Sequence, residues 1–319
     1  ATLDVTGRVA RQLLAFAESP ATIEAMKGFK LGFNLLEKEF PNRDAYDIHR
    51  HNRMDDFLDT FFIPQLNDHS INIINKKGLR PLNINALLLQ EFYIANNHFS
   101  SNNRINIDSL PQNFYYNSVH KKHHHVIRSF MNRFGYYDVF FIDNETANIV
   151  YTVYKEIDFA SSLNAGAYRN TNLAKAFNEV IQNDTSKGAF LVDFEEYIPS
   201  YNHPASFMAC AIKEKGKIIG VLAFQMPIDN INNLMTNNNK WKEIGLGLTG
   251  ETYLVGEDYT LRNQSRFLIE DSVGYYKLLK DIGVGNLKIN KIKNSKNTVG
   301  LQEVKTQGTK EALSGKIGN

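Results

Sequence analysis

Apolar residues recur at helical spacing through the first 40 residues of the chain. Val9, Leu13 and Phe16 begin the stripe. It continues at the same spacing with Met26, Phe29, Phe33, Leu36 and Phe40. A helix with one apolar side buries that side against another element. Pro20 after Ser19 predicts a break between two helices, because proline lacks a backbone donor and restricts the residue before it.

Three further segments in the first 135 residues also show a helical pattern. They span 55–66, 85–96 and 117–134, and Gly135 is expected to end the last of them in the left-handed conformation. The asparagine- and serine-rich stretch 100–111 predicts a loop. Residues 1–135 are therefore predicted to form a helical region.

From Tyr136 the pattern changes to that of strands, with dense runs of β-branched and aromatic residues separated by turn residues. The predicted strands span 138–143, 149–154, 189–194, 206–213 and 217–226. One amphipathic helix is expected between them, at 172–182. This order predicts an α+β fold in which long N-terminal helices pack on an antiparallel five-stranded sheet. The arrangement is PAS-like, and such a curved sheet commonly encloses a small-molecule pocket.

The pattern beyond residue 236 resembles the first half of another such module. A hairpin is predicted with strands at 252–255 and 259–262, and one amphipathic segment follows at 299–313. The remainder is polar and rich in asparagine and lysine, and the closing strands are missing. The predicted domains are a helical region at 1–135, a PAS-like ligand-binding module at 136–236 and an incomplete second module at 237–319.

Composition excludes several classes of protein. Apolar residues make up 43% of the 319 residues and charged residues 22%, which is ordinary for a globular protein and argues against disorder. The 36 lysines and arginines nearly balance the 34 acidic residues, so the chain lacks the basic excess of a nucleic-acid-binding protein. The single cysteine, Cys210, lies in a strand pattern and excludes an internal disulfide and a cysteine-rich zinc site.

The longest apolar run, at 218–226, is far shorter than the ~20 residues that a membrane-spanning helix needs. The chain also begins without methionine, inside a predicted helix. We therefore expect it to be a fragment of a larger protein, so that missing spans argue little against membrane attachment.

Several segments, in order, resemble the double Cache family, the PAS-like extracytoplasmic sensors of bacterial membrane receptors. The matching segments are 134–143, 150–159, 199–207, 220–229, 247–255 and 265–271. Receptors of this family carry chemotaxis, nucleotide cyclase or kinase outputs. The resemblance covers about residues 88 to 313 and implies a domain that binds a small molecule outside the cytoplasm and has no catalytic activity.

Two positions depart from the amino-acid-sensing members of that family. Such members carry an Arg-x-Trp-Tyr element before the pocket helix, whereas residues 167–172 contain no tryptophan. They also place an aspartate on the last strand, where this chain has Gln225. A neutral amide cannot form the charge-assisted hydrogen bond that a carboxylate forms with the ammonium group of a ligand. The sequence therefore argues against an ordinary α-amino acid and favours another small polar or anionic ligand.

The candidate ligand-binding residues are tyrosines with apolar faces and polar tips, together with polar side chains near the predicted pocket. They are Tyr151, Tyr154, Tyr168, Arg169, Asp193, Tyr197, Tyr201, Ser206 and Gln225. Arg169 could hold a carboxylate or phosphate in two hydrogen bonds, or it could pair with Glu156 or Asp158. The tyrosines could equally serve only to pack the sheet.

A cluster of histidines offers another chemistry. His120 and His124 are four residues apart on one helix face, a spacing that can bind zinc, and His123 and His125 lie beside them. The pattern lacks the glutamate of the His-Glu-x-x-His motif, so we expect a polar helix face and no metal. The glycines at 245–250 precede a strand instead of opening a helix, which excludes a dinucleotide site. No cofactor is expected.

The preferred interpretation is the periplasmic sensor domain of an inner-membrane receptor. A small polar or anionic ligand would bind the PAS-like module and shift the N-terminal helix, which leads to a membrane span outside this chain. The apolar stripe of that helix could also support a homodimer. Two alternatives stay open: a metal-dependent hydrolase that uses His120 and His124, and a protein-interaction domain without a small ligand.

Overall fold

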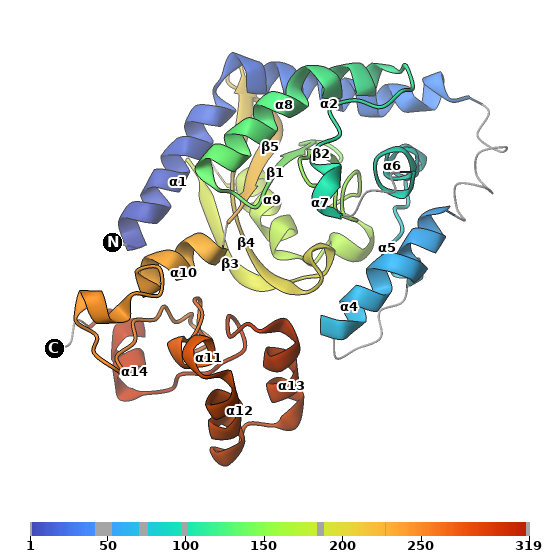
Figure 1. Cartoon of the computed structure of the whole chain (residues 1–319). Helices are drawn as coiled ribbons and strands as arrows, with labels where there is room; N and C mark the ends of the chain where they lie inside the picture. Colours follow the sequence, from blue (N-terminus) through green and yellow to red (C-terminus); the bar gives the residue numbers. More distant parts are fainter. Residues whose placement is uncertain are drawn as a thin grey trace. The chain divides into compact units, whose positions relative to one another are not determined.

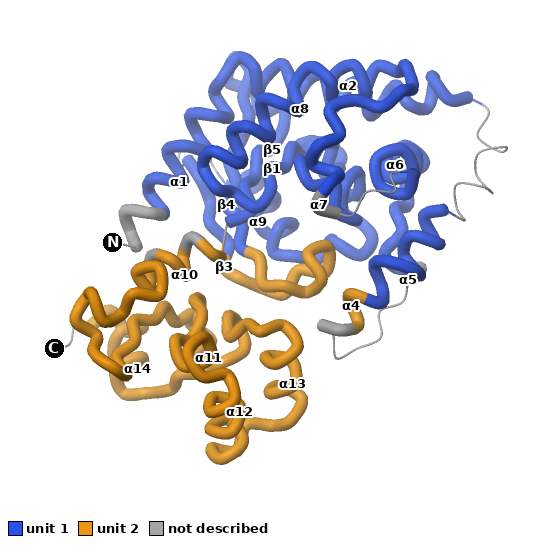
Figure 2. The backbone as a smooth tube through the Cα atoms, in the orientation of Figure 1, with its two compact units in different colours: residues 1–64, 74–192, 206–226 blue, residues 65–73, 193–205, 227–319 orange. Residues whose placement is uncertain are grey.

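The computed structural model describes residues 2–41, 53–69, 76–96, 101–183, 188–226 and 228–316. The chain divides into two compact units (Figure 2). Unit 1 consists of 1–64, 74–192 and 206–226, and unit 2 of 65–73, 193–205 and 227–319. The predicted N-terminal helices and most of the sheet thus share unit 1.

Two helices open the chain, α1 (Thr2–Ala17) and α2 (Pro20–Glu39). The predicted break between them is confirmed: the Ser19 side chain accepts a hydrogen bond from the Thr22 amide at 3.2 Å, and Pro20 takes the first helical position. Serine at the cap and proline at the first position both favour a helix start. The residues of the apolar stripe on α2 are buried: Met26, Phe29, Phe33 and Leu36.

The helix α8 (Tyr115–Phe134) lies alongside α2 (Figure 1). Two glycines of α2 allow this close approach. A Cβ atom on Gly32 would lie 2.9 Å from the Cα atom of Tyr116, and one on Gly28 would lie 2.8 Å from a methyl of Val119. As predicted, α8 ends at Gly135, whose φ of 72° is left-handed.

The expected five-stranded antiparallel sheet is present in the order β2-β1-β5-β4-β3. Its strands are β1 (Asp138–Ile142), β2 (Ile149–Thr152), β3 (Phe190–Tyr197), β4 (His203–Glu214) and β5 (Lys217–Gln225). The central strands β1 and β5 pair in regular register from Asp138 with Gln225 to Ile142 with Val221. The predicted α+β class, with N-terminal helices packed on a PAS-like sheet, is confirmed.

Alternate residues of the sheet point toward the N-terminal helices. The ring of Phe141 meets Phe29 of α2 at 6.1 Å between centroids, and Phe224 meets Phe16 of α1 at 6.2 Å. Cys210 on β4 is buried there too, and burial raises the pKa of its thiol to about 12. The helix α9 (Asn172–Gln182) packs on β5 and lies on the side of the sheet away from α1 and α8 (Figure 1).

Short helical segments complete the N-terminal part of the chain. They are α4 (Ile63–His69), α5 (Lys76–Leu79), α6 (Ile84–Gln90), α7 (Ser101–Arg104), two π-helical turns at Leu58–Phe62 and Glu91–Ala95, and a 3-10 turn at Gly166–Tyr168. The helix predicted at 85–96 is therefore α6 continued by a π-helical turn. Helix α6 packs against α2.

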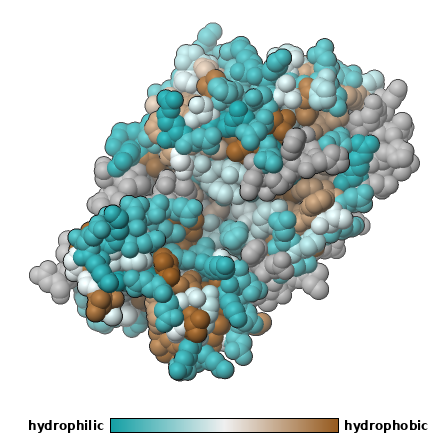
Figure 3. Space-filling view, viewed as in Figure 1, coloured by the Kyte–Doolittle hydropathy of each residue, from teal (hydrophilic) through white to brown (hydrophobic). Residues whose placement is uncertain are grey.

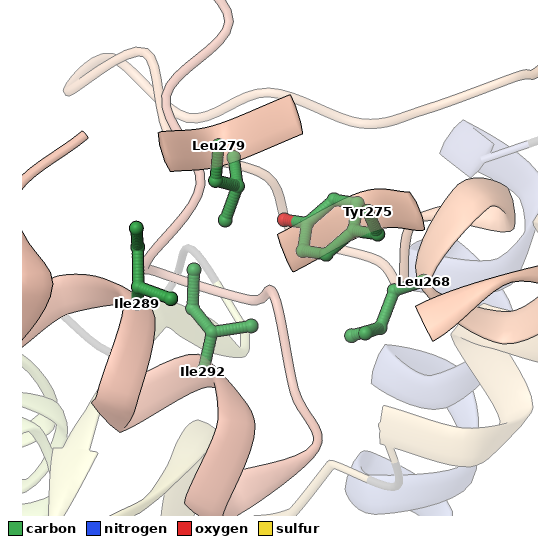
Figure 4. Packing of buried hydrophobic residues seen from close by; sticks show 5 residues of the cluster. All are labelled: Leu268, Tyr275, Leu279, Ile289 and Ile292. Atoms are coloured by element: carbon green, nitrogen blue, oxygen red, sulfur yellow. The ribbon is translucent and has the colours of Figure 1, made fainter. Parts of the chain in front are cut away.

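Unit 2 is mostly helical between residues 228 and 316. Its elements are α10 (Ile228–Thr236), a 3-10 turn at Trp241–Ile244, α11 (Arg266–Glu270), α12 (Ser272–Asp281), α13 (Asn286–Ser295) and α14 (Gln307–Leu313); a further 3-10 turn, Ile198–Ser200, joins β3 to β4. Five apolar side chains of α11, α12 and α13 point toward one another and form its core (Figure 4): Leu268, Tyr275, Leu279, Ile289 and Ile292. This core is small, and hydrophobic surface stays exposed on this unit (Figure 3), including Val273 at 78%.

The predicted hairpin at 252–262 exists only as a chain reversal. Isolated bridges join Val255 to Leu261 and Thr260 to Glu303, and residues 228–316 contain no strand. The Asp258 carboxylate accepts a hydrogen bond from the Thr260 amide at 2.9 Å, which curls the backbone before a ladder can extend. The expectation of a partial second PAS-like module therefore has no sheet to support it within 228–316.

Candidate functional site

A cavity of about 330 Å³ lies in unit 1 beside Tyr168, and we name it the Tyr168 cavity. Three segments that are distant in sequence form its wall: 80–86, 146–148 and 161–168. Its polar side chains are Arg80, Asn83, Thr146, Asn148, Ser161, Ser162 and Tyr168. The volume lies at the small end of the range for ligand pockets, which is about 300–1,000 Å³.

Hydrogen bonds within the loop after β1 fix one wall of the Tyr168 cavity. The Thr146 hydroxyl donates to the Asp143 carboxylate at 2.7 Å, and the Ser162 hydroxyl donates to the Thr146 carbonyl at 3.1 Å. Asp143 in turn forms an ion pair with Lys30 of α2 at 2.7 Å. The loop wall is therefore connected directly to the N-terminal helix.

Gln90 of α6 fixes the segment that leads into the lining at Ser161. Its side-chain amide is fully buried and donates to the carbonyls of Ile157 at 2.7 Å and Phe159 at 2.8 Å. The Tyr168 hydroxyl donates to the same Ile157 carbonyl at 3.2 Å. These bonds hold the segment after β2 against α6, because a buried carbonyl without a donor is costly.

Arg80 is the only charged residue in the described part of the chain that lines the Tyr168 cavity. Its Nη1 atom lies 3.3 Å from a carboxylate oxygen of Asp55, which is a long contact for an ion pair. Its Nη2 atom is buried and has no hydrogen-bond partner within the described part of the chain. A buried donor without an acceptor is rare in native proteins, so this atom is able to donate to a ligand in the cavity.

A second polar cluster lies where β1 and β2 meet. The buried Asp138 carboxylate accepts the backbone amides of Val139 at 2.6 Å, Val153 at 2.8 Å and Tyr154 at 3.3 Å. These bonds replace strand pairing, so β2 ends at Thr152 and not at Tyr154 as predicted. Burial raises the pKa of Asp138 to about 7, although the three amide donors oppose that rise.

Lys155 follows this cluster and is fully buried with a left-handed φ of 55°. Its ammonium donates to the Thr152 carbonyl at 2.7 Å and lies 4.8 Å from the ring centre of Tyr151. Burial lowers the pKa of Lys155 to about 7. The amine is held by this carbonyl and by the face of the Tyr151 ring.

The two histidines of the hydrolase alternative are buried core residues. The rings of His120 and His124 stack at 4.3 Å between centroids. Both ring nitrogens of His124 form hydrogen bonds, one with the Tyr151 hydroxyl and one with the Ile105 carbonyl, each at 2.7 Å. Burial lowers the pKa of His124 to about 2, and that of His120 well below its ordinary value. No group of potential metal ligands occurs among the described residues, so the geometry does not support a zinc site here.

The candidate residues of unit 1 take different positions. Tyr168 lines the Tyr168 cavity, whereas Tyr151 is a core residue stacked on Phe29 at 4.4 Å. The ring of Tyr154 stacks on that of Tyr137, and the Ser206 hydroxyl donates to the Val192 carbonyl. Gln225 is buried and pairs with Asp138 in the sheet, whereas Arg169 is exposed. No ion pair joins Arg169 to Glu156 or Asp158, all three of which the structure describes.

The candidate residues of unit 2 are Asp193, Tyr197 and Tyr201. Asp193 pairs with Arg262 of the same unit, with a shortest distance of 2.8 Å. Tyr197 is buried, and Tyr201 adopts a left-handed φ of 54°. The assignment of all nine residues to a ligand site stays a prediction.

Of the nine predicted ligand-binding residues, Tyr168 lines the Tyr168 cavity, and its other lining residues have no motif in the sequence. Arg80, Asn148 and Ser161 belong to segments that share no motif and lie far apart in the chain. Arg80 directly precedes Pro81 and a helix start, which is a common surface pattern. Only the tertiary fold brings these side chains together, so no sequence signal identifies them.

The fold and cavity define an α+β protein whose PAS-like sheet unit contains a small polar cavity. No family model matches the chain, and a search of curated proteins finds no match. No helix among the described residues combines the length and apolarity needed to cross a membrane.

Solved structures of one receptor are similar to the chain. The sensory domain of the Campylobacter jejuni chemoreceptor Tlp3 (CcmL) with isoleucine bound has 14% identity over 82% of this chain and 83% of that chain, with a TM-score of 0.30. The ligand-binding domain of Tlp3 in complex with L-valine has 15% identity over 82% of this chain and 84% of that chain, with a TM-score of 0.31. Similarity at this level assigns neither a residue role nor a ligand to this chain.

Proposed function

We propose that this chain is the extracytoplasmic sensor domain of a bacterial transmembrane signalling receptor, and that its ligand binds in the Tyr168 cavity. The cavity of about 330 Å³ within the PAS-like unit is the observation that supports this most directly. The resemblance of the sequence to double Cache sensors points to the same class. We propose no catalytic activity for the chain.

Two sets of contacts would connect a bound ligand to the N-terminal helix α2. The loop wall reaches α2 through Thr146, Asp143 and the ion pair of Asp143 with Lys30. A second part of the lining, Ala86, belongs to α6, which packs on α2. A ligand that draws these walls together would shift α2. The size of that shift is limited by the difference in ligand affinity between the two arrangements, commonly about 1–3 kcal/mol.

A homodimer through the N-terminal helices is part of the proposal, but the inward stripe of α2 is not available for it. Met26, Phe29 and Leu36 are fully buried within unit 1. A second copy would have to contact the outer face of α2, where Leu31 is 48% exposed. Periplasmic location and attachment through flanking spans are likewise proposals that rest on the family resemblance.

A screen of small polar metabolites by thermal unfolding tests the sensor proposal. A ligand that binds only the folded state raises Tm, and a hundredfold excess over its Kd adds about 2.7 kcal/mol. The variant Ala167→Trp places an indole in the cavity wall and should abolish the rise. The variant Ala21→Trp on the exposed side of α2 is the control and should keep it.

Two results would count against the proposal. One is that no compound raises Tm, and the other is that Ala167→Trp responds as fully as the wild type. Recovery of a bound compound in chemically altered form would favour an enzyme instead.

A further inference from the structure

We infer that the Tyr168 cavity selects a small hydroxylated monocarboxylate, whose carboxylate pairs with Arg80. This inference rests on the proposed function, since it assigns a chemical class to the ligand of the same cavity. It also places the anion at a residue that lies far in sequence from Arg169, the arginine that the sequence suggested.

The charge of the lining favours an anion. Among the described residues that line the Tyr168 cavity, Arg80 is the one with a charged side chain, and none of them is an aspartate or glutamate. Its Nη2 atom is buried without a hydrogen-bond partner in the described residues, while Nη1 keeps a long contact of 3.3 Å with Asp55. A guanidinium presents paired donors that match the two oxygens of a carboxylate.

The same charge limits the ligand to one negative charge. Asp55 neutralises part of the Arg80 charge from outside the lining, so the cavity has at most one positive charge to offer. A phosphate dianion would lack a partner for its second charge, and burial of an unpaired charge is costly. A monocarboxylate matches this balance.

Neutral polar groups in the lining account for the hydroxyl groups of the ligand. The Ser161 hydroxyl accepts a hydrogen bond from Gln90 at 3.4 Å, so its own proton stays available for a ligand oxygen. Asn148, which is only 7% exposed, adds a donor and an acceptor from a second segment. Hydroxyl and amide groups in the lining favour a ligand that carries hydroxyl groups over one with an alkyl chain, because an alkyl chain would leave their hydrogen-bonding atoms without partners.

Titration calorimetry with matched probes tests the inference. The probes are the carboxylates lactate, glycerate and gluconate, the neutral amide lactamide, the neutral alcohol glycerol, and inorganic phosphate. At least one carboxylate should bind saturably and at least tenfold more tightly than the neutral probes and phosphate. A charge-assisted hydrogen bond contributes about 1.5–3 kcal/mol, so Arg80→Gln should weaken that carboxylate about 10- to 100-fold.

Two variants separate loss of the anion contact from loss of folding. Arg133→Gln makes the same change at an exposed arginine in the last turn of α8, away from the lining, and should leave the affinity unchanged. Asp55→Asn removes the competing carboxylate and should tighten carboxylate binding several-fold, which misfolding cannot imitate.

The outcomes distinguish the two proposals. Equal binding of lactate and lactamide, tighter binding of phosphate, or an unchanged affinity in Arg80→Gln would overturn the monocarboxylate inference and leave the sensor proposal intact. If no carboxylate binds but Ala167→Trp abolishes a response to another metabolite, the inference alone fails. If no probe and no metabolite binds, both fail.

Discussion

Replacement of the buried Lys155 by methionine is expected to stabilise the chain at acid and neutral pH. The ammonium of Lys155 is fully buried and has one hydrogen-bond acceptor, the Thr152 carbonyl at 2.7 Å. Three aromatic rings surround it, those of Tyr151 at 4.8 Å, Tyr93 at 5.5 Å and Phe159 at 5.6 Å. Aromatic faces attract a cation but do not replace its hydration.

The magnitude follows from the pKa of Lys155. Burial lowers that pKa from 10.5 to about 7, and at about 1.4 kcal/mol per pH unit the folded state loses about 5 kcal/mol below pH 7. Methionine has a similar length and no charge. Its introduction leaves the Thr152 carbonyl without this donor, at a cost of about 1–3 kcal/mol. The net gain in the free energy of unfolding should therefore be about 2–4 kcal/mol, within the range found for the replacement of other buried charges.

The pH dependence gives the sharper test. Between pH 7 and 10.5 the unfolded state binds a proton that folded Lys155 lacks, so the stability of the wild type rises with pH across this window. Lys155→Met lacks this term, and its advantage should shrink from pH 6 to pH 9.5. Urea denaturation at both pH values measures it, with Lys121→Met on the exposed face of α8 as the control. The reasoning fails if Lys155→Met is less stable than the wild type at pH 6, or if its gain is equal at both pH values.

Three further outcomes are expected. Because burial lowers the pKa of His124 from 6.5 to about 2, the stability of the wild type should fall as the pH falls below 6.5, by about 3 kcal/mol at pH 4.5. His124→Asn should lose this part of the acid dependence. An unchanged dependence of stability on pH, measured by urea denaturation of the variant, would contradict the assignment. Gly32→Ala should destabilise the chain by about 1–3 kcal/mol, because its Cβ would lie 2.9 Å from the Cα of Tyr116, whereas Gly7→Ala in α1 should stabilise it by about 0.5–1 kcal/mol; thermal unfolding that ranks them in the opposite order would refute the packing argument. Gln90→Leu removes the side-chain donor of the buried Phe159 carbonyl, whereas the Ile157 carbonyl keeps the Tyr168 hydroxyl, so stability should fall by about 1–3 kcal/mol. An unchanged urea midpoint would show that these hydrogen bonds of Gln90 contribute nothing to stability.

Local chemistry made much of the fold predictable. The break at Ser19 and Pro20, the left-handed Gly135 and the bounds of α9 at 172–182 depend on neighbouring residues, and all three were predicted from the sequence. The order of the strands along the chain was predictable for the same reason, since alternating and β-branched runs favour strands wherever they occur. These features required no knowledge of distant contacts.

Contacts between distant residues decided the rest. β2 ends early because the Asp138 carboxylate, 15 residues before Val153 in the chain, accepts the amide that a longer strand would use. His120, His123 and His124 are buried where a polar helix face was predicted, because α8 packs against both α2 and β1, and only His125 of this group stays exposed.

The sequence by itself determined the helices, the strands and the antiparallel order from which the PAS-like class follows, because propensity and periodicity act within a few residues. Only the tertiary structure decided where a ligand could bind, since Arg80, Asn148 and Ser161 meet around one cavity through the packing of α6 and two loops. Charge and hydrogen-bonding capacity at such a site depend on which segments converge, and no local pattern in the chain records that convergence.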